Sequence, residues 1–246
     1  LGLLINYDNK IKLTGDKSLS KRDFSRVIKP LKKFGASFSL KKTLPLTMKG
    51  INKPKSIDYI ENKGSAQCKT SIMLAAVKSE GVTKIKAKKS RDHTEILFKY
   101  LKIPLKIKKF RKYDTIQIKG VKNIKSLNYK IPGDISSCSF FIVLTILSKD
   151  SKLLIKNVNV NPSRIGIIEI LKKMGASIKI LNKKNYKGEK TADIFIKSSK
   201  NLKAINCPSK YNSSAIDEFL VIFLVAAKAS GVSYFKKLDE LNQKES

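Results

Sequence analysis

The chain has 246 residues, 41% of them hydrophobic and 29% charged, so it is long enough to bury one or two compact cores. Its longest apolar run, Phe219 to Ala227, has nine residues, which excludes a membrane-spanning helix there. The N-terminus has no basic segment followed by an apolar one, so no signal peptide is predicted. We therefore expect a soluble protein of the cytoplasm.

The charge is strongly positive. The formal net charge is +33, from 52 lysines and arginines against 19 acidic residues, and it suggests nucleic-acid binding as one interpretation. Only five of these basic residues are arginines, and the lysines are spread along the whole chain among the acidic residues. No tract combines basic and aromatic residues as a nucleic-acid platform does. We rank nucleic-acid binding as a less favoured alternative and expect small anionic partners, with no nucleic acid and no membrane.

Cysteine and histidine are scarce. Cys68, Cys138 and Cys207 lie far apart, no Cys-x-x-Cys pair occurs, and His93 is the one histidine. A zinc site or a disulfide framework is therefore not expected. Because a buried cysteine is usually an inert core residue, we assign no nucleophile among the three.

The first fifty residues predict strands around one helix. Lys10 to Leu13 predicts a strand, and Ser20 to Lys33 predicts a helix with apolar residues on one face. Gly35 suits the left-handed position that ends such a helix. Ala36 to Leu40 and Leu44 to Met48 predict two further strands.

Residues 64–95 contain two helix starts rich in small polar residues. Gly-Ser-Ala-Gln-Cys-Lys-Thr (64–70) precedes an apolar helix, Val82 to Lys86 predicts a strand, and Ser-Arg-Asp-His-Thr-Glu (90–95) opens a second helix. Helix N-termini carry unpaired N–H groups and a positive dipole end, which favour an anion such as phosphate. The alternative is purely structural, because serine and aspartate are common caps and Asp92-x-x-Glu95 matches a capping box.

Two patterns recur along the chain. The segment LKKFGAS (31–37) returns as LKKMGAS (171–177). A longer unit, consisting of a helix start, an apolar helix, a tight turn and a strand, recurs at Ser65 to Ile85, Ser136 to Ile155 and Ser213 to Phe235. Such recurrence indicates one supersecondary module used several times. Helices such as Phe140 to Leu147 are apolar on more than one face, so we expect them to be buried between layers.

The domain boundary is expected after the polar stretch 121–128. This places one domain at residues 1–130 and a second at 131–246. Within the second, Lys183 to Lys190 predicts an exposed hairpin loop. Ile205 to Pro208 predicts the end of a strand that leads into the third helix start.

The motifs of residues 64–70 and 90–95 resemble those of the EPSP synthases (3-phosphoshikimate 1-carboxyvinyltransferases), and the resemblance covers essentially the whole chain. It implies an α/β fold of two domains, each an inside-out α/β barrel of repeated βαβαββ units with parallel helices enclosed by sheets. Further segments that match the family in order are Thr14 to Arg22, Pro132 to Ser137, Asn161 to Gly166, Ile216 to Glu218 and Lys244 to Ser246.

The resemblance implies transfer of the enolpyruvyl group of phosphoenolpyruvate to the 5-hydroxyl of shikimate 3-phosphate. Ser65 and Gln67 correspond to shikimate 3-phosphate ligands, with Gln67 also near phosphoenolpyruvate. Ser90 and Arg91 correspond to further contacts with the shikimate phosphate and ring. Arg22 corresponds to a phosphoenolpyruvate ligand, although a solvated helix charge is the alternative.

The reaction also needs groups that move protons. Asp217 resembles the carboxylate that accepts the hydroxyl proton, and Glu245 resembles the second acid–base carboxylate. Lys244 would stabilise charge near the shikimate hydroxyls. Asp134 is expected to cap its helix, and Arg164 is interpreted as structural. The scheme requires no metal or organic cofactor, so none is expected.

Two departures from the family pattern bear on activity. The family commonly has Leu-Arg-Val before Lys-Glu-Ser, whereas residues 241–243 here are Leu-Asn-Gln. The family's first phosphate-binding motifs and its later arginines fall outside residues 1–246. We therefore expect a fragment that is inactive by itself. The resemblance also implies a monomer. The sister enzyme that uses UDP-N-acetylglucosamine remains the alternative enzyme, disfavoured by the motifs at 65–67 and 90–95.

Overall fold

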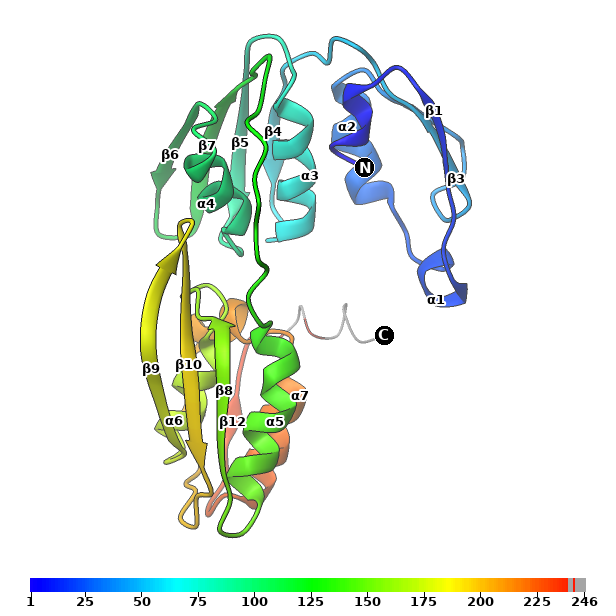
Figure 1. Ribbon diagram of the computed structural model, residues 1–246. Coiled ribbons are helices and arrows are strands. Elements are labelled where there is room, and N and C mark those ends of the chain that lie inside the picture. Colours follow the sequence, from blue (N-terminus) through cyan, green and yellow to red (C-terminus); the bar gives the residue numbers. More distant parts are fainter. Residues whose placement is uncertain (239–240, 242–246) are drawn as a thin grey trace. The chain divides into compact units, whose positions relative to one another are not determined.

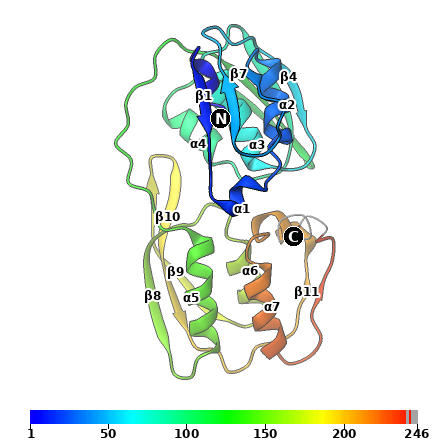
Figure 2. The ribbon, with the colours of Figure 1, turned by 90° about the vertical axis from the view of Figure 1, so that its right-hand side faces the viewer.

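The structure is a computed structural model that describes residues 1–238 and 241. The chain divides into two compact units, Leu1–Leu127 and Asn128–Ser246, each containing helices and sheets (Figures 1 and 2). Each unit has its own hydrophobic core.

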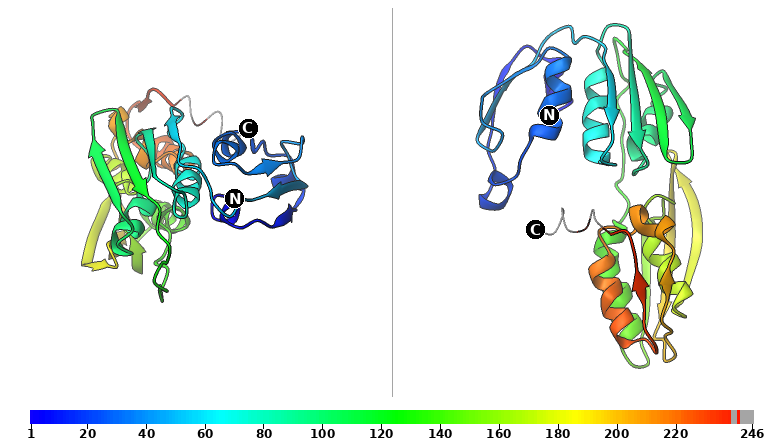
Figure 3. Two further views of the ribbon diagram at one scale, coloured as in Figure 1. Left: turned by 90° about the horizontal axis from the view of Figure 1, so that it is seen from above. Right: turned by 180° about the vertical axis from the view of Figure 1, so that it is seen from behind.

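Unit 1 begins with a strand–helix–hairpin module. Its three strands lie in the order β1-β3-β2, and both pairs are antiparallel. The helix α2 packs against α3 of the next module, and both lie between the two sheets of the unit (Figures 1 and 3). The elements are η1 (Leu4–Asn6), β1 (Lys10–Leu13), α1 (Lys17–Ser20), α2 (Ser25–Lys33), β2 (Ser37–Phe38) and β3 (Leu46–Lys49).

The helix expected from Ser20 to Lys33 is confirmed over Ser25–Lys33, but its start is wrong, because residues 21–24 form a turn between α1 and α2. Asp16 caps the short α1, and the backbone N–H of Phe24 donates to the carbonyl of Lys42, 2.8 Å away, rather than continuing that helix. Pro30 lies inside α2 and has no N–H for the carbonyl of Arg26. That carbonyl accepts the thiol of Cys68 on α3 at 3.2 Å, which joins the two helices.

The second module of unit 1 is a complete βαβαββ unit. Its sheet order is β4-β5-β7-β6, with β4 and β5 parallel and the other pairs antiparallel. Along β5 the side chains of Thr83, Ile85 and Ala87 are buried and their neighbours are exposed, as expected for a half-buried strand. The elements are β4 (Asp58–Glu61), α3 (Ala66–Ala76), β5 (Val82–Lys88), α4 (His93–Tyr100), β6 (Leu105–Lys109) and β7 (Tyr113–Lys119).

Unit 2 repeats this topology. A bridge pairs Gly133 in parallel with Val158 of β8, and the sheet continues in the order β8-β10-β9. The parallel pair β11 and β12, joined through α7, forms a further β-α-β segment. The elements are α5 (Ile135–Leu147), β8 (Lys152–Asn159), α6 (Gly166–Lys173), β9 (Ser177–Tyr186), β10 (Glu189–Lys197), β11 (Asn206–Cys207), η2 (Ser209–Ser214), α7 (Phe219–Lys228) and β12 (Tyr234–Phe235).

The repeated LKK-x-GAS segments occupy equivalent places. Each ends a helix, α2 or α6, and leads into the following strand, β2 or β9. Gly35 and Gly175 have φ angles of +109° and +91°, the left-handed conformation that glycine adopts most easily. Leu31 and Leu171 are both fully buried. The sequence repeat is thus a repeat of structure.

The hairpin expected at 183–190 is present, but its loop is shorter than predicted. β9 continues to Tyr186 and β10 begins at Glu189, so only Lys187 and Gly188 form the turn. Both residues have positive φ angles, +51° and +90°, as two-residue hairpin turns require.

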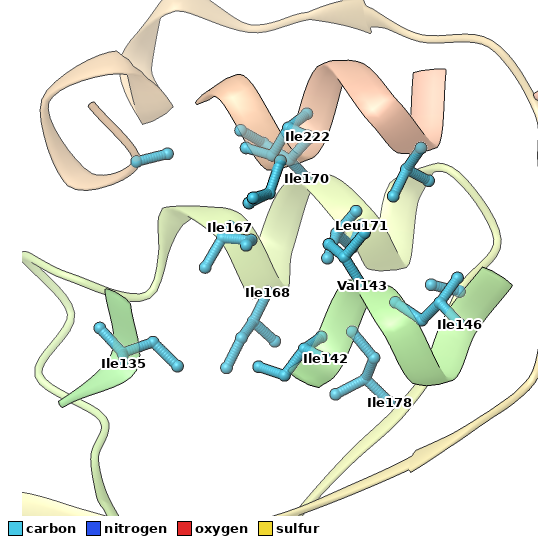
Figure 4. Close-up of a cluster of buried hydrophobic side chains, with 14 of the residues drawn as sticks. Ile135, Ile142, Val143, Ile146, Ile167, Ile168, Ile170, Leu171, Ile178 and Ile222 are labelled. Atoms are coloured by element: carbon cyan, nitrogen blue, oxygen red, sulfur yellow. The ribbon is translucent and has the colours of Figure 1, made fainter. Parts of the chain in front are cut away.

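The core of unit 2 is built from aliphatic side chains of α5, α6 and α7 (Figure 4). Ile168 of α6 points toward Ile142 of α5, and both are fully buried. The expectation that the helix at 140–147 is buried between layers is confirmed for the face with Ile142, Val143 and Ile146 and wrong for the opposite face. Phe140 and Leu144 are 65% and 63% exposed, because the sheet and the neighbouring helices cover only one side of α5.

The helices of each unit begin at a common end. In unit 1 the N-termini of α2, α3 and α4 lie at one end, and in unit 2 the same holds for α5, α6 and α7 (Figures 1 and 2). This follows from the topology, because helices that connect parallel strands all run in one direction. Among the residues that the structure describes, every helix is too short or too polar to cross a membrane.

Candidate functional site

The first helix start in unit 1 is built by Ser65. This residue is the N-cap of α3, and its hydroxyl accepts the N–H of Cys68 at 3.2 Å. The loop before it is held by the buried carboxylate of Glu61, which accepts the N–H groups of Lys63 and Gly64 at 3.1 and 2.9 Å. The exposed side chain of Gln67 lies on the first turn of α3. Ser65 therefore has the predicted capping role, and its place at the helix N-terminus also suits an anion.

The second helix start carries Ser90 and Arg91, just before α4. It is tied to α3 by Lys69, whose ammonium lies 2.6 Å from a carboxylate oxygen of Glu95 and 2.7 Å from the main-chain carbonyl of Arg91. Lys69 and Glu95 are only 2% and 5% exposed. The structure thus brings the two predicted helix starts together through one buried ion pair.

The capping box expected from Asp92 and Glu95 is not formed. Asp92 is the N-cap of α4, but its side chain makes no capping hydrogen bond. Glu95 points instead to Lys69, because a buried carboxylate needs a charged partner more than a helix end needs a second cap. The local sequence matched the capping pattern, and the contact with α3 overrode it.

The second helix start has buried polar atoms with no partner among the described residues. They are the hydroxyl oxygen of Ser90 and the second carboxylate oxygen of Glu95. Such atoms are rare in folded proteins and require an explanation. The hydroxyl of Ser90 has the chemistry to donate a hydrogen bond to an oxygen of a bound anion.

Arg22 lies in the exposed turn between α1 and α2. In the described part of the chain, no hydrogen bond or ion pair connects its side chain to the residues at the starts of α3 and α4. It belongs to the same unit and precedes a helix that packs against α3. The structure therefore places Arg22 at the helix-start end of unit 1 without showing a contact with the other candidates.

In unit 2, three helix starts are joined by a polar network. The guanidinium of Arg164, just before α6, donates to Asp134 Oδ1 at 2.6 Å and to Ser136 Oγ at 2.7 Å. Ser136 donates in turn to the carboxylate of Glu218, the N-cap residue of α7, which is 1% exposed. Asp217 directly precedes Glu218 and is exposed. The network fixes the main chain beside Asp217.

Sequence reasoning assigned Asp134 as a cap, and its carboxylate accepts the N–H of Ser137 at 3.0 Å, so that prediction is confirmed. The hydrogen bond between Ser136 and Glu218 was not predicted from the sequence. The available signal was a glutamate at the head of an almost wholly apolar helix, where a buried carboxylate needs a partner. Lys244 and Glu245 lie outside the described residues.

The cysteines are poor nucleophiles. Burial raises the pKa of the Cys68 thiol to about 11, and burial also raises the pKa values of Cys138 and Cys207. At neutral pH a thiol with so high a pKa carries almost no reactive thiolate. Within residues 1–238 and 241, no group of three or more His, Cys, Asp or Glu side chains is arranged to hold a metal ion.

Known proteins resemble this chain over its whole length. Residues 1–246 match the family described as EPSP synthase (3-phosphoshikimate 1-carboxyvinyltransferase). The chain is 40% identical over 238 residues to the 3-phosphoshikimate 1-carboxyvinyltransferase of Petrotoga mobilis, covering 95% of this chain and 54% of that protein. It is 39% identical over 247 residues to that of Clostridium tetani, covering 100% and 55%.

Solved structures agree with this match. An EPSP synthase from Acinetobacter baumannii superposes with a TM-score of 0.84 at 36% identity, over 100% of this chain and 55% of that one. The enolpyruvyl transferase NikO from Streptomyces tendae gives a TM-score of 0.67 at 11% identity, over 94% of this chain and 53% of that one, which shows likeness of fold alone. The chain spans about half the length of the relatives that it matches.

Proposed function

We propose a function for the protein that contains this chain, which belongs to the EPSP synthase family. The protein transfers the enolpyruvyl group of phosphoenolpyruvate to the 5-hydroxyl of shikimate 3-phosphate. Its fold is the α/β enolpyruvyl transferase fold with repeated βαβαββ units. Activity and substrates are proposed for the whole protein, because the chain covers about half of its relatives. The observation that carries the proposal is the pair of helix starts joined by Lys69 in unit 1.

Shikimate 3-phosphate is proposed to bind at these helix starts. Ser65 and Gln67 offer a hydroxyl and an amide at the N-terminus of α3, where the helix dipole favours phosphate. Ser90 offers a buried hydroxyl, and Arg91 offers a guanidinium that matches phosphate geometry. The geometry supports the assignment because the Lys69–Glu95 pair holds the two starts against each other.

Phosphoenolpyruvate is proposed to bind through Arg22 and Gln67, with Lys244 near the shikimate hydroxyls. A doubly anionic substrate needs cationic groups around it, and arginine is suited to both its phosphate and its carboxylate. The support for Arg22 is its motif and its position in the turn just before α2.

The proposed reaction has three proton transfers, which need two acid–base groups. The 5-hydroxyl oxygen attacks carbon 2 of phosphoenolpyruvate while carbon 3 gains a proton, and the hydroxyl proton passes to Asp217. The tetrahedral adduct then loses phosphate from carbon 2 and a proton from carbon 3, which restores the double bond. Glu245 is proposed as the second acid–base group. Asp217 is supported by its exposed position beside the anchored Glu218.

The two compact units are proposed to belong to the two domains of the whole enzyme. Unit 1 holds the proposed phosphate-binding residues, and unit 2 holds Asp217. A cytoplasmic monomer remains the expectation. Gel filtration of the full-length protein would measure its mass in solution, and a dimer peak would contradict that expectation.

The test is an assay of phosphate release by the full-length protein. We expect release when phosphoenolpyruvate and shikimate 3-phosphate are both present, and a product with the mass of the enolpyruvyl ether. UDP-N-acetylglucosamine in place of shikimate 3-phosphate should give no product. Turnover with that acceptor and none with shikimate 3-phosphate would favour the sister reaction instead.

A further inference from the structure

Lys69 makes two contacts with different consequences. Its ammonium neutralises Glu95 at 2.6 Å, and it also donates to the main-chain carbonyl of Arg91 at 2.7 Å. The first contact joins α3 to α4. The second fixes the backbone of the loop that carries Ser90 and Arg91. Because Lys69 is 2% exposed, it has no direct access to a ligand in solution.

Unit 2 shows that the fold does not need this ion pair. Alignment of α3 with α5 by their buried residues, Cys68 with Cys138 and Ile72 with Ile142, places Ser139 at the position of Lys69. The hydroxyl of Ser139 donates to the carbonyl of Ser136 in its own helix, 2.6 Å away.

The partner position is apolar in unit 2. Alignment of α4 with α6 by the positive-φ residues after them, Lys102 and Gly175, places Ile168 at the position of Glu95. Ile168 is fully buried and points toward α5 (Figure 4). The same alignment pairs Arg91 with Arg164. One module therefore buries an ion pair where the other buries an isoleucine.

The two loops are consequently anchored by different atoms. In unit 2 the guanidinium of Arg164 itself binds the N-terminal turn of α5, through Asp134 and Ser136. In unit 1 the main-chain carbonyl of Arg91 is held by the ammonium of Lys69. A buried ion pair gives no stability advantage over a well-packed apolar pair, so stability alone does not explain Lys69.

We infer that Lys69 is a positioning residue for the anion site: it fixes the backbone at Arg91 so that the side chains of Ser90 and Arg91 face the same ligand as Ser65 and Gln67. This inference rests on the proposed function for the identity of the ligand, shikimate 3-phosphate. In this inference the buried Lys69 holds the loop in place, and Arg91 binds the ligand.

The experiment uses two variants of the full-length protein. Lys69→Met alone leaves Glu95 buried without its cation, so we expect a large loss of stability. Lys69→Met with Glu95→Ile replaces the ion pair by an apolar pair, with the isoleucine that unit 2 has at the position of Glu95, and should unfold in urea close to the wild type. In this double variant we expect the KM for shikimate 3-phosphate to rise about 10- to 100-fold, as for a misplaced binding group. The KM for phosphoenolpyruvate should change little.

A matched control removes a different contact between the same helices. The hydroxyls of Thr70 and Thr94 lie 2.6 Å apart and join α3 to α4 without involving the carbonyl of Arg91. Thr70→Val should lower stability slightly and leave the KM for shikimate 3-phosphate unchanged. If the double variant regains both stability and the wild-type KM, Lys69 serves only packing and the inference is wrong.

Amide hydrogen exchange separates this inference from the proposed function. In the double variant, the amides of residues 89–92 should exchange faster than in the wild type, while those of α3 remain protected. Wild-type protein that does not turn over the two substrates contradicts the proposed function, and the exchange measurement then decides the positioning role. Unchanged exchange at residues 89–92 overturns the inference.

Discussion

The two helix-start corners of this protein share a topology and differ in chemistry. In unit 1, the starts of α3 and α4 are joined by a buried lysine and glutamate, and the cap of α3 is the neutral Ser65. In unit 2, the starts of α5, α6 and α7 are joined by Arg164, Ser136 and Glu218, and the cap of α5 is the charged Asp134. The same βαβαββ framework therefore carries two different polar networks.

The two different polar networks indicate different functions for the two helix-start corners. In unit 2 the carboxylate of Asp134 forms an ion pair with Arg164, which follows β8, so this guanidinium is bound by a residue of its own unit. In unit 1 the corresponding N-cap, Ser65, supplies a neutral hydroxyl. The positive end of the α3 dipole therefore still favours a bound anion. Unit 1 thus has the corner suited to hold phosphate, and unit 2 has the corner suited to hold the backbone beside Asp217.

The largest effect is expected at Asp217, since unit 2 is assigned the proton transfer. Asp217→Ala should lower kcat by roughly 100- to 10,000-fold, the usual contribution of a general base. Thermal unfolding should be almost unchanged, because the side chain is exposed. Steady-state kinetics of the full-length protein would measure this, and near-normal kcat would remove Asp217 from the mechanism.

The second prediction concerns Ser65, the N-cap of α3 in unit 1, which is replaced by aspartate, the residue type that caps α5 in unit 2. Ser65→Asp keeps a good N-cap but places a carboxylate at the proposed phosphate position, so the KM for shikimate 3-phosphate should rise on the order of 100-fold. Ser65→Asn, which also caps without adding charge, is the matched control. Equal KM values for the two variants would show that the helix start does not bind phosphate.

The third prediction concerns the network of unit 2. Glu218→Ala removes the buried acceptor of Ser136 and should lower the free energy of unfolding by about 2–4 kcal/mol. Glu218→Gln keeps an acceptor and should cost less. Urea titrations would compare both variants with the wild type, and wild-type stability of Glu218→Ala would mean that the carboxylate and its hydrogen bond are unimportant.

The smallest effect concerns the pH dependence of unit 1. Because the pKa of Cys68 is raised to about 11 in the folded state from an ordinary value of 9.0, the folded protein keeps a proton that the unfolded chain loses. The contribution of Cys68 to stability is complete below pH 9 and declines as the pH rises toward 11, by on the order of 1 kcal/mol. Urea unfolding at pH 8 and at a higher pH within this window, compared with Cys68→Ala, would measure it. An identical decline in the variant would assign the effect to other groups.

Local features were predictable because they depend on neighbouring residues. Ser65 and Asp134 cap helices as their side chains and positions indicated, and the two LKK-x-GAS segments end helices at left-handed glycines. The start of the helix expected at 20–33 was predicted wrongly, because the hydrogen bond from Phe24 to Lys42 joins residues that local patterns do not connect. The family was also recognisable, because its motifs are short contiguous strings.

The caps of α3 and α5, the module repeat, the family and the types of residue at each helix start could be read from the amino-acid sequence. Which of these residues contact one another depends on the fold. Lys69 finds Glu95 on another helix, and Ser136 finds Glu218 across 82 positions of the chain. Such pairs are fixed by the direction of the strands and by burial, which forces a charged side chain to find a partner wherever the fold supplies one.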